Sequence, residues 1–92
     1  MGAGMKRGIV IDPKDNVGLV LEPVNAGETV DFGVCHLKVM EPIKALHKVA
    51  LCELGLGNAV VKYGQPIGYA TAQISKGQWV HVHNLDAEKM MK

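Results

Sequence analysis

Short aliphatic segments separated by turn residues make up most of the chain. One pattern recurs: an aliphatic residue, two further residues, a bend position, two further residues and a valine. Its four copies are Val24 to Val30, Ile43 to Val49, Leu54 to Val60 and Ile74 to Val80. Glycine suits most of the bend positions because it reaches positive φ without steric cost. These positions are Gly27, Leu46, Gly57 and Gly77. Each copy predicts a strand, a turn and a strand, and their spacing as two pairs indicates a pseudo-twofold arrangement of hairpins.

The segments between these copies also have the character of β-strands. Gly8 to Ile11 and Val17 to Leu21 are short and aliphatic, and the turn-rich residues 12–16 separate them. Alternation over Val34 to Met40 predicts three inward-facing side chains, those of Cys35, Leu37 and Val39. The sequence leaves no room for a long helix, and we predict an all-β domain.

The last third of the chain combines a loop signal with a strand signal. Residues 62–68 hold two glycines and a proline, which predicts a loop leading into a strand over residues 69–74. Strict alternation then predicts a strand over residues 79–83. It places Val80 and Val82 on one face, and on the other Trp79, His81 and His83. Residues 85–92 are expected to be a connection outside the core.

Composition restricts the class of protein. Apolar residues make up 48% of the chain and the net charge is +1, which is typical of one small globular domain. No basic patch indicates nucleic-acid binding, and no apolar run indicates a membrane span or an export signal. Cys35 and Cys52 are read as reduced, small apolar strand residues of a cytoplasmic chain. We expect a leader over 1–7, a domain over 8–85 and a tail over 86–92.

Histidines supply the clearest candidate chemistry. On a strand, His81 and His83 are close enough to converge on one divalent cation, although two imidazoles seldom suffice and a third ligand, such as His47, is needed. The alternative is that both are exposed residues of an edge strand. His47 and Lys48 follow the second bend, where an imidazole can act as acid or base and an ammonium can pair with an anionic substrate. The alternative is a solvated turn.

Three polar residues are further candidates. Asp15 and Asn16 form a polar pair that either contacts a substrate or completes a turn. Asn84 offers an amide that either holds a substrate hydroxyl or ends a strand. The chain lacks the glycine-rich sequence of a phosphate-binding loop and the Gly-x-Ser-x-Gly of a serine hydrolase, so any active site is expected to be shared with another component.

Taken together, four segments resemble the amino-terminal SAF domain of the altronate and galactarate dehydratase family, which has a β-clip fold. They are residues 15–17, 47–51, 62–70 and 81–84, within a similarity that extends from Lys6 to Leu85. The small subunit of sulfolactate sulfo-lyase shares the resemblance. The family usually has glycine directly before its His-Lys pair, where this chain has Leu46.

This resemblance implies a small subunit that docks on a large catalytic subunit and acts on a small acidic substrate. The implied reaction is dehydration of a sugar acid by β-elimination, helped by Fe²⁺ or Mn²⁺. Elimination of sulfite from sulfolactate is the alternative, as are a binding module without catalytic duty and a metal carrier. His47 and Lys48 are then expected to be catalytic, and His81 and His83 to bind the metal. The substrate is expected to contact Asp15, Asn16, Tyr63 and Asn84. In isolation the chain is expected to be inactive and able to pair with itself.

Overall fold

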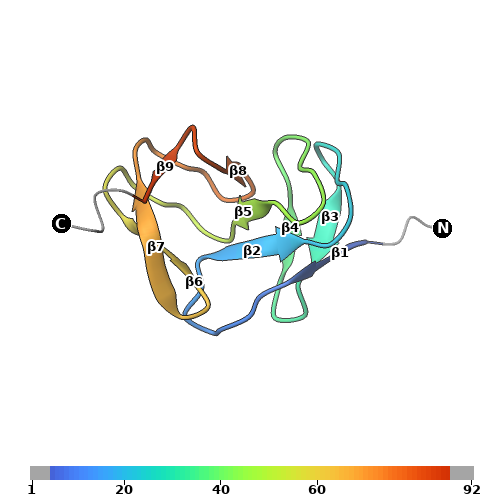
Figure 1. Cartoon of the computed structure of the whole chain (residues 1–92). Helices are drawn as coiled ribbons and strands as arrows, with labels where there is room; N and C mark the ends of the chain where they lie inside the picture. The colour runs from blue at the N-terminus through green and yellow to red at the C-terminus, as the bar shows by residue number, and fades with distance from the viewer. Residues whose placement is uncertain (1–4, 88–92) are drawn as a thin grey trace.

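The chain folds into two small curled sheets, as the computed structural model shows for residues 5–87 (Figure 1). A six-stranded sheet has the order β4-β3-β1-β2-β5-β8, and a three-stranded sheet has the order β6-β7-β9. The strands of the larger sheet are β1 (Lys6–Ile9), β2 (Val17–Val20), β3 (Thr29–Asp31), β4 (His36–Lys38), β5 (Lys48–Ala50) and β8 (Trp79–Val80). Those of the smaller sheet are β6 (Ala59–Lys62), β7 (Gln65–Ala70) and β9 (Leu85–Asp86). The described residues contain no helix, so the prediction of a small all-β domain is confirmed.

The four sequence copies form four equivalent turns, as predicted. Each has positive φ at its bend, including Leu46 at 67°, and each begins with a residue in a short β-bridge. The bridges pair Val24 with Ile43 and Leu54 with Ile74, so the copies join as two pairs. Each bend N–H also donates to a carbonyl of the paired half, namely those of Val39, Val20, Ala70 and Ala50 in chain order of the bends. The shared pattern confirms the pseudo-twofold arrangement.

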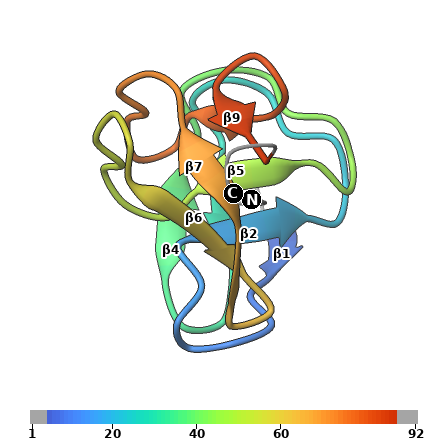
Figure 2. The same ribbon diagram turned by 60° about the vertical axis from the view of Figure 1, so that its left-hand side comes forward.

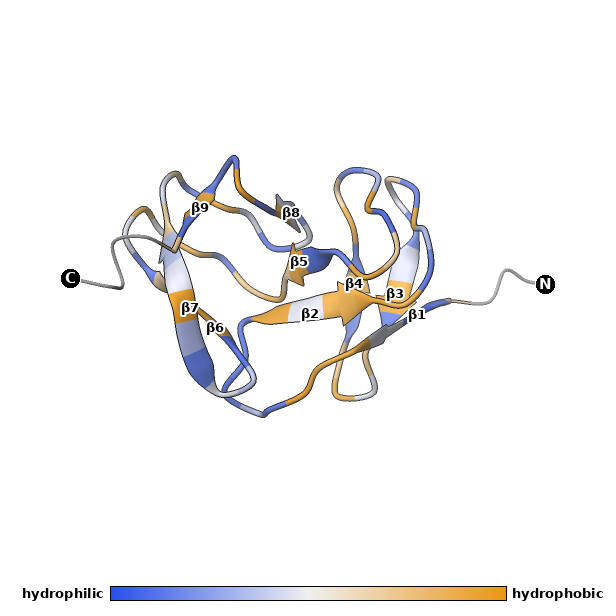
Figure 3. Ribbon diagram, in the orientation of Figure 1, coloured by the Kyte–Doolittle hydropathy of each residue, from blue (hydrophilic) through white to orange (hydrophobic). Residues whose placement is uncertain are grey.

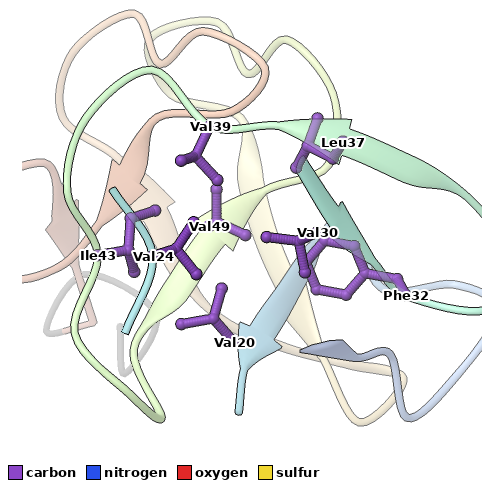
Figure 4. Close-up of a cluster of buried hydrophobic side chains, with 8 residues drawn as sticks. All are labelled: Val20, Val24, Val30, Phe32, Leu37, Val39, Ile43 and Val49. Carbon is purple, nitrogen blue, oxygen red and sulfur yellow. The ribbon is translucent and has the colours of Figure 1, made fainter. Parts of the chain in front are cut away.

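Two apolar clusters lie on either side of β2 and β5. Alternate side chains of β5 and β8 point to opposite faces of the sheet. The pair Val49 and Trp79 faces one cluster, and the pair Lys48 and Val80 faces the other way. The first cluster gathers around Val49 and is drawn in Figure 4. The second gathers around Val17, Ala50 and Val80. Figure 3 shows the apolar colour over most of β2 and on part of β5.

The segment expected to be a loop over residues 62–68 is instead a β-hairpin. Tyr63 and Gly64 both have positive φ, which matches a two-residue turn, and β6 and β7 pair on either side of it (Figure 2). The register shifts at Val60 and Val61, next to the pairing of Val61 with Pro66. Because β9 pairs only with the end of β7, Pro66 has a single strand neighbour, and the sheet tolerates its missing N–H.

Other local expectations also need correction. The strand predicted over residues 79–83 ends at Val80, and Val82 is 80% exposed. Cys35 and Cys52 are exposed and lie outside the strands, whereas Leu37 and Val39 are buried as predicted.

The expected chain ends differ from the observed elements. β1 begins at Lys6, within the range expected to be a leader, and β9 pairs with β7 where a connection was expected. Leu85 of β9 also packs against the second cluster. Residues 1–4 and 88–92 of the expected leader and tail lie outside the described residues.

Candidate functional site

Four rings gather at the β8 edge of the larger sheet. The Trp79 ring centroid lies 5.1 Å from that of His81, which is stacked on it, and 4.9 Å from that of His83. His47 lies 5.8 Å from Trp79 and 5.1 Å from His81, also between ring centroids. The structure therefore brings together three histidines from two segments, as the hypothesis of a His47, His81 and His83 site requires.

His47 is placed by the second turn. The turn is closed by a hydrogen bond from the His47 N–H to the Lys44 carbonyl, and the His47 carbonyl accepts the Val20 N–H. Its ring then meets the indole, whose Nε1–H donates to Nδ1 of His47 at 3.1 Å. Both backbone and side chain thus hold this imidazole in one orientation.

Trp79 is fixed by its strand and by an acidic side chain. β8 pairs with β5, and on the open edge of β8 the Trp79 N–H donates to the Glu41 carboxylate at 3.0 Å. The indole also lines an open hollow of about 230 Å³ whose wall is mostly apolar. Its other lining residues are Pro23, Val24, Asn25, Pro42, Ile43 and Lys44. Neither Trp79 nor Glu41 was predicted from the sequence to be a site residue, although alternation had placed Trp79 on the same face as the histidines.

A tight turn, held by Asn84, places His81 and His83. The Asn84 side chain accepts the His81 N–H at 2.9 Å and donates to the Trp79 carbonyl, also at 2.9 Å. Asn84 is only 3% exposed. The structure therefore gives this amide the role of ending the strand, one of the two roles that the sequence left open.

Lys48 acts on the cluster electrostatically and Lys62 acts on Lys48, and the Glu41 carboxylate also lies beside the cluster. Partial burial lowers the pKa of Lys48, and the nearby Lys62 ammonium lowers it further. Desolvation also lowers the pKa of His81, followed by repulsion from His47, Lys48 and His83. Each shift favours the uncharged side chain, and a bound anion would relieve the repulsion. The arrangement is thus suited to an acidic ligand.

The candidates Asp15, Asn16 and Tyr63 lie at the turn between β6 and β7. Asn16 receives the Val61 N–H and donates to the Ala59 carbonyl, while Asp15 accepts the Gly64 N–H at 2.8 Å. Backbone hydrogen bonds, the first from Gly64, outweigh desolvation and lower the pKa of Asp15. Asp15 and Asn16 therefore fasten the loop over residues 12–16 to the hairpin.

Tyr63 is exposed at the tip of this hairpin. Its ring lies 4.5 Å from the Lys62 ammonium. Lys62 also acts electrostatically on Lys48, which follows His47 in the chain. Within residues 5–87, the ring contacts of the histidine cluster join His47, Trp79, His81 and His83 and do not extend to Tyr63.

The histidines do not make a complete metal site. Within residues 5–87, no group of three or more His, Cys, Asp or Glu side chains could hold a metal ion. Nδ1 of His47 already accepts the indole N–H, which leaves fewer free nitrogen ligands in the cluster. A metal at this position would need ligands from another chain or segment.

These features define a small β domain with a cationic, imidazole-rich edge. Comparison with known proteins identifies its class, because residues 6–88 match the altronate/galactarate dehydratase SAF domain. The chain belongs to this family. No helix among the described residues is long and apolar enough to cross a membrane.

Relatives of two kinds share this domain. Altronate dehydratase of Bacillus subtilis is 41% identical over 80 residues, which are 87% of this chain but 16% of that enzyme. Altronate dehydratase of Escherichia coli is 38% identical over 83% of this chain and 15% of its own length. In contrast, the (2R)-sulfolactate sulfo-lyase subunit alpha of Chromohalobacter salexigens is 33% identical over 88% of this chain and 94% of its own length. The chain thus spans a small part of the dehydratases and nearly all of the sulfo-lyase subunit.

Proposed function

We propose that this chain is the small subunit of a lyase that eliminates water from a sugar acid such as altronate or galactarate. The observation that carries the proposal is the convergence of His47, His81 and His83 on Trp79, beside Lys48. Membership of the dehydratase SAF family and the similarity to altronate dehydratase support the choice of reaction. The chain contains only part of an active site, so a large catalytic subunit is the expected partner.

The reaction needs groups that bind an anion and manage protons. A base takes the proton from the carbon next to the substrate carboxylate, a carbon–carbon double bond forms, and the adjacent carbon loses its hydroxyl group, which is protonated and leaves as water. The resulting enol becomes a 2-keto acid. We assign the Lys48 ammonium to the carboxylate, and His47 and His81 to the oxygens on which negative charge develops. Metal dependence, with Fe²⁺ or Mn²⁺, remains part of the hypothesis and requires ligands from the partner.

A second candidate is elimination of sulfite from sulfolactate. The observation that favours it is length, because this chain matches 94% of a protein that is itself a separate subunit. In that reaction the carbon–sulfur bond breaks, sulfite departs with the bonding electron pair, and the enol again becomes a keto acid. The same cationic edge would hold the carboxylate and the sulfonate.

The test is to recover the tagged chain with its partner from the source organism. The complex is then assayed for keto-acid formation from altronate and galactarate, and for sulfite release from sulfolactate. His47→Ala and His81→Ala are each expected to lower turnover by about 100-fold or more if their side chains stabilise charge in the transition state. His36→Ala is the matched control, because His36 is exposed and pairs with Asp31 on the far side of the larger sheet. Turnover unchanged in both site variants would refute the proposal.

A further inference from the structure

The contact between Trp79 and His47 determines which nitrogen of the imidazole holds its proton. An indole N–H only donates, so the atom that it meets must be an acceptor. That atom is Nδ1 of His47, 3.1 Å from the indole nitrogen. A neutral imidazole with a free electron pair on Nδ1 carries its proton on Nε2.

We infer that Trp79 is a positioning residue that locks neutral His47 in the tautomer with the proton on Nε2. His47 then presents an N–H donor to a ligand and has no free electron pair on that nitrogen. It stabilises negative charge on a substrate oxygen by donating a hydrogen bond, and it does not abstract the proton from carbon. The tautomer follows from the hydrogen bond alone, whereas the role given to Nε2 rests on the proposed function.

The surroundings keep the pair in place. The His47 and Trp79 backbones are held independently, by the second turn and by the Glu41 carboxylate. The ring of His81 stacks on the indole, and Trp79 packs partly against the first apolar cluster. The indole therefore cannot turn away without losing the stacking and the packing.

Nitrogen-15 NMR of the histidine rings of the 92-residue chain tests the inference. The charged and titratable groups near the pair include Glu41, Lys48, His81 and His83. The spectra are therefore recorded at about pH 8.5, where an imidazole with an ordinary pKa of about 6.5 is neutral. The expected result is a protonated Nε2 and an unprotonated Nδ1 on His47. A protonated Nδ1 would overturn the inference.

The variant Trp79→Phe removes the indole N–H and keeps an aromatic ring. Loss of one hydrogen bond is expected to raise the ratio of the Nδ1-protonated to the Nε2-protonated tautomer by about two- to tenfold. An unchanged ratio in a folded variant would contradict the inference. His36 gives the control signal in the same spectrum, since it pairs with Asp31 and lies on β4, at the opposite end of the strand order from the β8 strand of Trp79.

A second measurement covers the case in which Trp79→Phe fails to fold. Hydrogen exchange of the indole N–H is expected to be about two- to tenfold faster in His47→Ala than in the unaltered chain. His83→Ala is the matched control, because it removes a ring from the indole but not its acceptor. Equal exchange in the unaltered chain and His47→Ala would overturn the inference.

These measurements separate the two hypotheses. If the Nε2 tautomer is found but His47→Ala and His81→Ala both retain full turnover in the recovered complex, the proposed function fails and the tautomer assignment stands. If Nδ1 is protonated while His47→Ala loses turnover, the proposed function stands and the inference fails.

Discussion

At the scale of single residues, Leu46 shows how the hydrogen bonds of the turn outweigh a local preference. The other bends have glycine, yet Leu46 adopts the same left-handed conformation, with φ of 67°. Its N–H donates to the Val20 carbonyl, as the equivalent glycine N–H groups do in the other turns. Leucine in place of the family's glycine before His47 therefore leaves the conformation of the bend unchanged, but it lowers the stability of the fold.

Replacing Leu46 with glycine is expected to stabilise the fold. A left-handed conformation costs a residue with a side chain about 1–2 kcal/mol, and glycine loses about 0.5–1 kcal/mol more in chain entropy, so the net gain is about 0.5–1 kcal/mol. Because Leu46 is exposed, little packing is lost. Chemical denaturation measures the change. The reverse substitution, Gly27→Leu, has open space around the new side chain and is expected to cost a similar amount. Destabilisation by Leu46→Gly would contradict the argument.

Lys48 is expected to reduce stability at neutral pH because its ammonium is desolvated and faces Lys62. Its pKa is lowered on folding, so the unfolded chain binds the proton more tightly, and stability rises with pH between the folded pKa and about 10.5. Lys48→Met should therefore raise the denaturation midpoint at pH 7, and this advantage should shrink as the pH approaches 10.5.

Denaturation of Lys48→Met across this pH range checks the prediction. Lys38→Met is the control, because Lys38 is exposed on β4. A pH-independent difference between Lys48→Met and the unaltered chain would show that the charge is not the cause.

At the scale of elements, the repeated turns could be predicted from the sequence, and two other elements could not. Repetition of one pattern revealed the turns because each copy makes the same hydrogen bonds. Alternation predicted a strand over residues 79–83, but the Asn84 amide takes the His81 N–H and ends it at Val80. The segment after Lys62 was predicted to be a loop because it contains Pro66, which a central strand does not tolerate. In the structure Pro66 has only one strand neighbour, because β9 pairs only with the end of β7.

The candidate site was predictable only in part. The sequence identified the three histidines, whereas the contact with Trp79 depends on β5 pairing with β8, which joins segments about 30 residues apart. For Asp15 and Asn16 the sequence favoured a turn role over contact with a ligand, and their bonds to the hairpin show how they serve the structure.

Substitution of Asn84 should disrupt the turn that presents His81 and His83. Asn84→Ala leaves the partly buried partners of the amide unsatisfied and is expected to cost about 1–3 kcal/mol in unfolding free energy. Asn84→Asp retains the acceptor for His81 but loses the donor to the Trp79 carbonyl, and should destabilise as well. Thermal and chemical denaturation measure both variants. If Asn84→Ala has the stability of the unaltered chain, the amide does not hold this turn.

At the scale of the whole molecule, the two apolar clusters share the strands β2 and β5. Val17 belongs to one cluster and Val20 to the other, and Val49 and Ala50 are divided in the same way. Neither half can therefore unfold without removing strands from the other. The site depends on this coupling because its rings come from two sequence copies, with His47 in residues 43–49 and Trp79 in residues 74–80.

The coupling predicts a single unfolding transition. Ile74→Val trims the second cluster and is expected to cost about 0.5–1.5 kcal/mol. Trp79 packs against the first cluster, so its fluorescence reports on the cluster that the substitution does not touch. The fluorescence midpoint should move together with that of far-ultraviolet circular dichroism. Two separated midpoints would show that the halves unfold independently.

The pairing of β5 with β8 also bears on how such a site can arise by duplication. Lys48 and Trp79 occupy the same position in their respective copies, and each pairs with the valine that follows in the other copy. Two identical half-chains assembled as a dimer would be forced to carry the same residue at both places. Fusion into one chain removes that constraint, so one half can retain a cation while its counterpart evolves an indole.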